Sequence, residues 1–217
     1  MPIFIISLVT GVGLSIAWYA LCRRYNRRKA SKILRWIESA LAGEGKVLGM
    51  RWITPSQFKT PLRLTSRMFH RAWIHVDLAP RQTPIRWLFR TFRREPETIV
   101  FQADLDTPPL FALEIQNFRS FARSNRSVGA GGPEWNFIRT QPFVISSGTD
   151  WQKEVTSTLT SLAASGSRDY LSIRFRRSSP HFCVTLPLEA ISPETAGNEL
   201  MLDVMRELAT KSSAKLF

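Results

Sequence analysis

The sequence predicts an α+β protein with an N-terminal transmembrane helix and one domain, which has an antiparallel sheet of about six or more strands and about three helices. Three observations indicate this fold class. The first 22 residues carry no charged side chain. Several later segments alternate apolar and polar residues, as half-buried strands do. Other segments repeat apolar residues three and four positions apart, which is the spacing of an amphipathic helix.

The N-terminal segment has the length and composition of a membrane span. Residues 3–22 are predominantly apolar, and twenty helical residues extend about 30 Å, the thickness of the hydrocarbon layer. Trp18 and Tyr19 stand near the end of this run, where interfacial aromatic residues belong. A cleaved signal peptide would place basic residues before a shorter apolar run. We therefore expect a single-pass signal-anchor.

Basic residues directly after the apolar run predict its orientation. Five of the seven residues 23–29 are positively charged, namely Arg23, Arg24, Arg27, Arg28 and Lys29. Such a cluster stays on the cytoplasmic side, so we expect the N-terminus outside and the domain inside, at a cell (inner) membrane or at an organelle membrane of the same orientation. We also expect these five side chains to contact lipid phosphates.

Small residues recur along the apolar segment. Ser7, Gly11 and Ser15 are four residues apart, a spacing that lets two membrane helices approach closely. A homodimer formed through this face is one interpretation. The other is that Gly and Ser are simply common in such helices.

Positive charge is concentrated in the half of the chain next to the apolar run. The net charge is +13, but residues 23–94 carry +15 and residues 95–217 carry −2. A basic surface favours an anionic partner, either phospholipid headgroups or nucleic acid. Most basic residues are arginines, which bind phosphate in a bidentate fork; a GC-rich genome would also favour arginine.

Periodicity divides the remaining chain into elements. We expect a basic juxtamembrane segment and amphipathic helix over 23–45, after the anchor 1–22, and an α+β domain over 46–217. The helix of 30–42 either continues the membrane helix or lies along the surface. In the domain we expect strands at 47–53, 62–68, 72–78 and 142–146, hairpins at 99–115 and 171–188, a mobile loop at 119–134, and helices at 83–94, 150–164 and 192–208.

The segment 83–94 is the strongest functional candidate. Its apolar positions form one stripe, and its remaining surface is rich in arginine; the stripe is Ile85, Leu88, Phe89 and Phe92, and the arginines are Arg86, Arg90, Arg93 and Arg94. We expect the stripe to pack on the sheet and the arginines to form a solvated face that contacts lipid headgroups. The alternative is a membrane-surface helix, which this composition resembles.

The sequence contains no pattern that carries catalysis, metal binding or cofactor binding. None of the three histidines has a second ligand at metal-site spacing. His75 and Asp77 share a strand face, and Asp104 and Asp106 flank a turn, but strand and turn chemistry explain both pairs. Cys22 and Cys183 form no disulfide framework. We expect no catalytic residue, no metal and no cofactor.

These observations favour a membrane-anchored, non-enzymatic binding or scaffold domain whose basic N-terminal half contacts anionic lipid headgroups. Three alternatives stay open. One is a membrane-tethered nucleic-acid-binding protein, because basic and aromatic residues interleave at 67–73 and 86–94. The others are a small-ligand-binding domain and an enzyme of unknown chemistry, since sequence patterns do not reveal cavities.

Overall fold

A computed structural model describes residues 2–43, 45–65, 69–106, 108–109, 112–117, 136–140, 143–147 and 172–190. Its first element is one unbroken helix, α1, of 39 residues from Pro2 to Ala40. The predicted helix of 30–42 therefore continues the apolar helix rather than lying apart from it. Neither glycine nor proline occurs between residues 23 and 42 to interrupt it. Gly43 follows the helix with φ 90°, a conformation that favours glycine.

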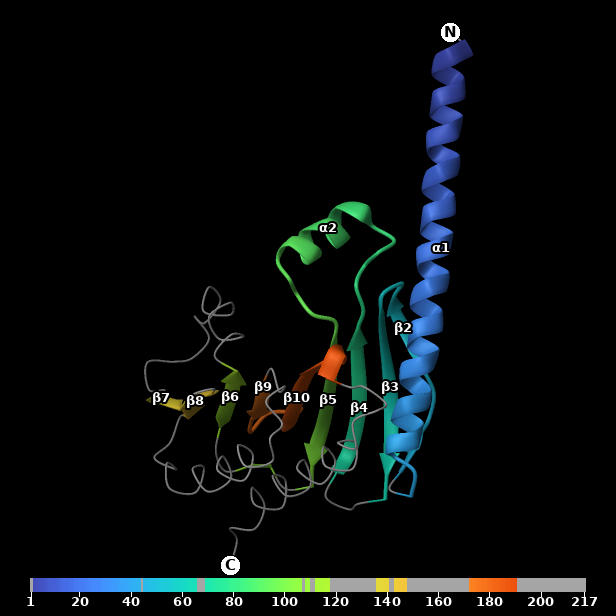
Figure 1. Cartoon of the computed structure of the whole chain (residues 1–217). Coiled ribbons are helices and arrows are strands. Elements are labelled where there is room, and N and C mark those ends of the chain that lie inside the picture. The colour runs from blue at the N-terminus through green and yellow to red at the C-terminus, as the bar shows by residue number, and fades with distance from the viewer. Residues whose placement is uncertain are drawn as a thin grey trace, which may run out of the picture.

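The first half of α1 stands clear of the domain (Figure 1). Its most apolar 18-residue window has a mean hydropathy of 2.0, and none of that window is buried. By length and composition, α1 could therefore cross a membrane.

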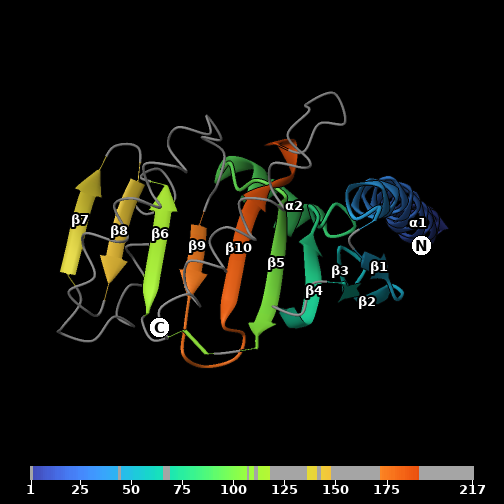
Figure 2. The ribbon, with the colours of Figure 1, turned by 90° about the horizontal axis from the view of Figure 1, so that it is seen from below.

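The rest of the described chain builds one ten-stranded antiparallel sheet, as the sequence predicted for the fold class. The strand order is β1-β3-β4-β5-β10-β9-β6-β8-β7, and β2 also pairs with β3 (Figure 2). The strands are β1 (Gly45–Val47), β2 (Arg51–Thr54), β3 (Gln57–Leu64), β4 (Phe69–Asp77), β5 (Thr98–Leu105), β6 (Leu113–Asn117), β7 (Asn136–Thr140), β8 (Phe143–Ser147), β9 (Ser172–Phe175) and β10 (Phe182–Pro187). Helix α2 (Pro84–Phe92) connects β4 to β5, and a short 3₁₀ helix, η1 (Leu188–Ala190), follows β10.

The two predicted hairpins have different outcomes. The hairpin of 171–188 is confirmed, because β9 pairs with β10 in a register that includes Phe175 with Phe182. The hairpin of 99–115 is wrong. Strand β5 pairs with β4 and β10, while β6 pairs with β9 and β8. The β9–β10 hairpin thus inserts between β5 and β6, and pairing between distant segments replaces the local turn.

Alternation decides which face of the sheet is buried. Strand β5 alternates strictly, with Ile99, Phe101, Ala103 and Leu105 buried and the residues between them partly exposed. The second half of α1 packs on this apolar face, and it buries Ala30, Ile33, Ile37 and Leu41 in the same core as the strands. The second half of α1 is therefore a structural part of the domain.

The other predicted strands are found in part. The strand of 47–53 is two short strands, β1 and β2, and that of 72–78 is the larger part of β4. The strand of 142–146 is β8, whereas β7 had no predicted counterpart. The weak candidate at 62–68 only overlaps the end of β3. The predicted loop of 119–134 and helices of 150–164 and 192–208 lie outside the described residues.

Candidate membrane-contact site

Helix α2 presents its apolar stripe to the outside. The four stripe side chains Ile85, Leu88, Phe89 and Phe92 are between 52% and 78% exposed, and no residue of α2 is buried. The expectation that this stripe packs on the sheet is therefore wrong. Pro84 occupies the first turn, a position that suits proline, and the helix begins within one residue of the predicted start but faces the other way.

Two side chains on the opposite face of α2 explain this orientation. With 3.6 residues per turn, Trp87 and Arg90 lie on the opposite face, each about 150° from the centre of the stripe. Arg90 donates to Leu78 O at 3.1 Å and Pro96 O at 2.8 Å. It also pairs with Asp77 at 3.0 Å, and its side chain is only 14% exposed. The rigid guanidinium fork thus joins α2 to the connections on both sides of it.

Helix α2 also contacts α1 within the apolar run. The Trp18 and Trp87 rings lie 6.3 Å apart between centroids, and Trp18 Nε1 donates to Arg81 O at 3.0 Å. Trp18 precedes Cys22, the end of the run, by four residues, or about 6 Å along a helix. The end of the domain that carries α2 therefore lies beside the last turn of the apolar run.

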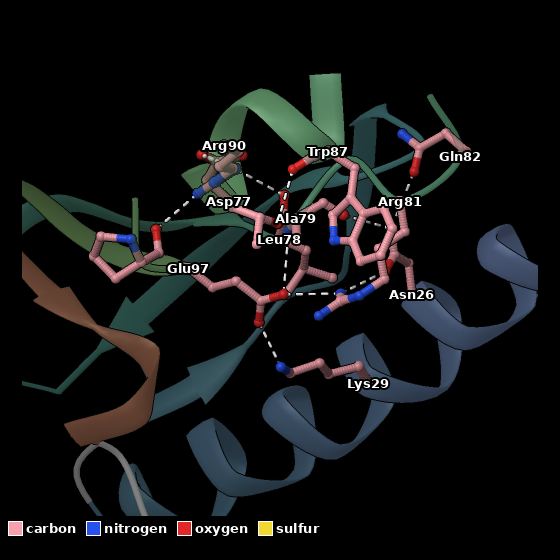
Figure 3. A network of polar contacts seen from close by, with 12 residues as sticks. Asn26, Lys29, Asp77, Leu78, Ala79, Arg81, Gln82, Trp87, Arg90 and Glu97 are labelled. Atoms are coloured by element: carbon pink, nitrogen blue, oxygen red, sulfur yellow. Dashed lines mark hydrogen bonds and ion pairs between the residues drawn. The ribbon is translucent and has the colours of Figure 1, made fainter. Parts of the chain in front are cut away.

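A buried polar cluster fixes α1 to the domain just below this level (Figure 3). Asn26 on α1 is fully buried. Its amide donates to Ala79 O at 3.2 Å and Gln82 Oε1 at 3.3 Å, and it accepts from Arg81 at 3.3 Å. Burial of an amide requires such partners, so Asn26 sets both the rotation of α1 and its height against the sheet.

Glu97 is the second centre of the cluster. Its carboxylate pairs with Lys29 of α1 and with Arg81 at 2.9 Å, and it accepts the Ala79 N–H at 3.1 Å. Burial by itself would raise the pKa of Glu97, but the hydrogen bonds from Lys29 and Ala79 and the charges of Lys29 and Arg81 outweigh it and hold the pKa below its ordinary value. The ionised form therefore ties α1 to the start of β5.

The predicted phosphate-contacting residues separate into two groups. Those with exposed side chains are Arg23, Arg24, Arg27 and Arg28 on α1 and Arg86, Arg93 and Arg94 on or just after α2. The other two, Lys29 and Arg90, face inward in the ion pairs with Glu97 and Asp77. The structure brings the exposed groups to the same end of the domain, because Trp18, Arg81 and Trp87 join α1 to α2.

The predicted helix-association residues lie on the free half of α1. Ser7, Gly11 and Ser15 are exposed. A side chain added at Gly11 would meet nothing within 4 Å, and the Ser15 hydroxyl donates to Gly11 O at 2.8 Å within the helix. Association of two copies through this face stays a prediction.

A cavity of about 720 Å³ lies between α1, α2 and the adjacent end of the sheet. Its apolar lining includes Ile33, Trp36, Trp87 and Leu188, and its charged lining comprises Lys29, Lys32, Arg81, Arg90, Arg94, Glu95, Glu97 and Glu189. Five cations and three carboxylates leave an excess of two positive charges. Among the described residues, Trp36 Nε1 is a buried donor without a hydrogen-bond partner.

Arg94, on the rim of this cavity, has an unusual backbone. Its φ is 49°, in the left-handed region where glycine is the usual residue after a helix. The N–H groups of Arg94 and Glu95 close the helix end on Thr91 O and Arg90 O. A long cation at this position costs about 1–2 kcal/mol of backbone strain relative to glycine. Such an outlier motivates a hypothesis of function.

The other titratable pairs have structural partners. Asp77 accepts from Gln57 and Arg90 and does not bond to His75. Burial lowers the pKa of His75 even though Asp77 opposes it. Asp104 accepts from the Ser179 hydroxyl at 2.7 Å across the sheet end. Within the described residues, no three His, Cys, Asp or Glu side chains lie close enough together to hold a metal ion.

Sequence reasoning missed Asn26, Arg81 and Glu97 and used Trp18 only as an interfacial marker. Two weak signals were present: Asn26 interrupts a run of arginines, and Glu97 follows a long segment poor in acids. No family model matches the chain, and no curated protein matches it.

Proposed function

We propose that this chain is a single-pass membrane protein with its N-terminus outside, and that it holds a non-enzymatic binding or scaffold domain against the anionic cytoplasmic leaflet of a cell (inner) membrane or of an equivalent organelle membrane. The proposal rests above all on one observation. Arg23, Arg24, Arg27 and Arg28 are exposed directly below the apolar run, on a helix that Asn26 and Glu97 fix to the domain.

Two physical arguments support the assignment. A basic side chain close to an anionic leaflet contributes about 1 kcal/mol of attraction. Because α1 continues unbroken into the core, this attraction acts on the whole domain rather than on a flexible linker. The second half of the chain carries a net charge of −2, so nothing in its charge draws it to the leaflet, and it is free to meet a partner.

The test uses residues 23–217, which lose the contacts of Trp18 with Arg81 and Trp87 but keep Asn26, Lys29 and the buried face of α1 from Ala30 to Leu41. We expect co-sedimentation with anionic vesicles, weak co-sedimentation with neutral ones, and loss of binding as salt rises. Replacing Arg24, Arg27 and Arg28 by Gln removes about 3 kcal/mol of attraction, so binding at low salt should weaken about a hundredfold.

The matched control replaces three exposed cations of the basic half that lie at the opposite end of the sheet, Lys46, Arg63 and Arg71, by Gln. This variant should bind almost as the parent does. Equal losses in both variants would mean that total charge, not position, drives binding. Salt-sensitive binding to oligonucleotides without vesicle binding would instead favour the nucleic-acid alternative.

The cavity favours a second candidate function, which is binding of an amphipathic anion. Its apolar walls suit a hydrocarbon body, and its excess positive charge suits a phosphate or carboxylate. The unpartnered Trp36 Nε1 offers a further donor. This interpretation does not compete with the first, because the cavity lies on the inner side of α2.

The probe for the cavity is the amphipathic anion 8-anilinonaphthalene-1-sulfonate, with residues 23–217 carrying Phe89→Gln and Phe92→Gln so that the exposed stripe does not bind it. We expect one saturable site per chain. Lys32→Gln combined with Arg94→Gly should weaken it about tenfold, and glycine suits the φ of residue 94. Unsaturable binding, or binding unchanged by the substitutions, would contradict a site in the cavity.

A further inference from the structure

We propose that α2 is a second membrane anchor, which lies in the plane of the interface and inserts Ile85, Leu88, Phe89 and Phe92 among the acyl chains of the same leaflet. The inference rests on the proposed function, because it requires α1 to span the bilayer. It goes further by naming hydrocarbon, rather than headgroup charge, as the partner of this face.

The exposure of the stripe requires an apolar partner. Four large apolar side chains on one face of a nine-residue helix are each more than half exposed. A contiguous apolar patch of this kind marks an interaction surface. The opposite face of α2 is already used by Trp87 and Arg90, so α2 cannot turn its stripe inward without breaking those contacts.

The position of α2 identifies that partner as the bilayer. Trp18 touches Trp87 about 6 Å above the end of the apolar run of α1. Interfacial helices bury their apolar face about 5–10 Å into the boundary between headgroups and acyl chains. Helix α2 is thus at the depth that such a helix occupies, beside the exposed apolar surface of α1.

Charge complements this placement. Arg86 and Arg93 project from one flank of α2, about 90° from the centre of the stripe. At an interface, long cationic side chains extend to the headgroups while their stems cover apolar surface. A protein partner or a second copy would explain the apolar stripe, but it would not require the match in depth with α1.

Two anchors fix what one leaves free. A single helix lets the domain tilt relative to the plane of the membrane. With α1 and α2 both held, and with Asn26 and Glu97 joining α1 to the sheet (Figure 3), the strands lead away from the membrane. The end of β4 at His70 then lies about 23 Å from its end at Asp77. The strand ends farthest from α2 therefore face the cytoplasm.

The test measures depth in the full chain, reconstituted in vesicles that contain phosphatidylcholine with nitroxide-labelled acyl chains. An environment-sensitive fluorophore is attached to one cysteine at a time, after Cys22 and Cys183 are replaced by Ser. Reporter positions are Phe89→Cys and Phe92→Cys. Retained Cys22, at the end of the apolar run, is the positive control, and His70→Cys, exposed at the opposite end of β4, is the negative control.

We expect nitroxide quenching at positions 89 and 92 to be at least half of that at Cys22, with none at position 70. Quenching as weak as at position 70 would overturn the inference. A blue-shifted but unquenched label would overturn it too, by indicating a protein partner on the stripe. If position 89 is unquenched while residues 23–217 still bind anionic vesicles in a salt-sensitive way, insertion fails and the proposed function stands.

Discussion

Replacing Glu97 by Ala is expected to lower the free energy of unfolding of residues 23–217 by about 3 kcal/mol, because it leaves two partly buried cations without their counter-charge and a buried N–H without its acceptor. The Glu97 side chain is 11% exposed, and the substitution removes the acceptor for Lys29, Arg81 and the Ala79 N–H together. For a domain of this size, that loss corresponds to a fall of roughly 10 °C in Tm. Thermal or denaturant unfolding followed by circular dichroism measures it.

Glu95 is the matched control for this prediction. It stands two residues earlier, and its side chain is 48% exposed. Its ion pair with Arg93 is long, at 3.8 Å. Glu95→Ala should therefore change the free energy of unfolding by less than about 0.5 kcal/mol. If the two variants prove equally stable, Glu97 does not hold α1 to the sheet.

The pH dependence of stability supplies a second measurement of the same contact. The pKa of Glu97 is lower in the folded chain than in the unfolded chain, so the unfolded state binds more protons as pH falls. The stability from this group is fully present above the ordinary glutamate pKa of about 4.3 and is lost as pH falls through the folded value. Glu97→Gln should remove this part of the acid sensitivity, so that the gap between wild type and variant narrows at low pH.

Phe89→Gln combined with Phe92→Gln is expected to reduce vesicle partitioning of residues 23–217 about a hundredfold without lowering stability. Burying one large apolar side chain contributes about 1.5–3 kcal/mol. Even partial insertion of two rings should therefore contribute about 3 kcal/mol, which is close to a hundredfold. The two side chains are 62% and 78% exposed in the folded chain, so their loss leaves no cavity in the core.

Arg86→Gln combined with Arg93→Gln separates charge from insertion on the same helix. At about 1 kcal/mol for each charge, partitioning should fall about thirtyfold at low salt and hardly at all at high salt. The Phe pair should show a loss that salt does not remove. Arg90 stays unchanged in both variants because its guanidinium holds α2 in place. A Phe variant that partitions as well as wild type would exclude a contribution from the stripe.

A domain held in this way differs from one on a flexible tether. The proposed electrostatic contact lies at the level of Arg23 to Arg28, whereas α2 meets α1 one to three turns higher, where Trp87 contacts Trp18. The two contacts are therefore distinct in depth and in salt response. That difference lets the experiments above assign each contact independently.

The local sequence pattern was sufficient to predict much of the secondary structure of this protein. The apolar run with its basic flank is confirmed as one helix long and apolar enough to span a membrane. The alternation of 99–105 and 171–188 gave the correct strand faces and the correct β9–β10 hairpin. The predicted range 83–94 contains α2, which Pro84 begins and whose stripe has helical spacing. Each of these features depends on residues within a few positions of one another, so the sequence contains the physical information directly.

The tertiary structure alone decided which surfaces meet. Periodicity shows that Ile85, Leu88, Phe89 and Phe92 share a face, but not whether that face packs on the sheet or stays exposed. Contacts made by Trp87 and Arg90 with residues on α1 and on the flanking connections set that orientation. In the same way, β5 pairs with β10 and not with β6, and Glu97 meets Lys29 across 68 residues of chain. Such contacts arise from the free energy of the whole packed domain, which no short segment specifies.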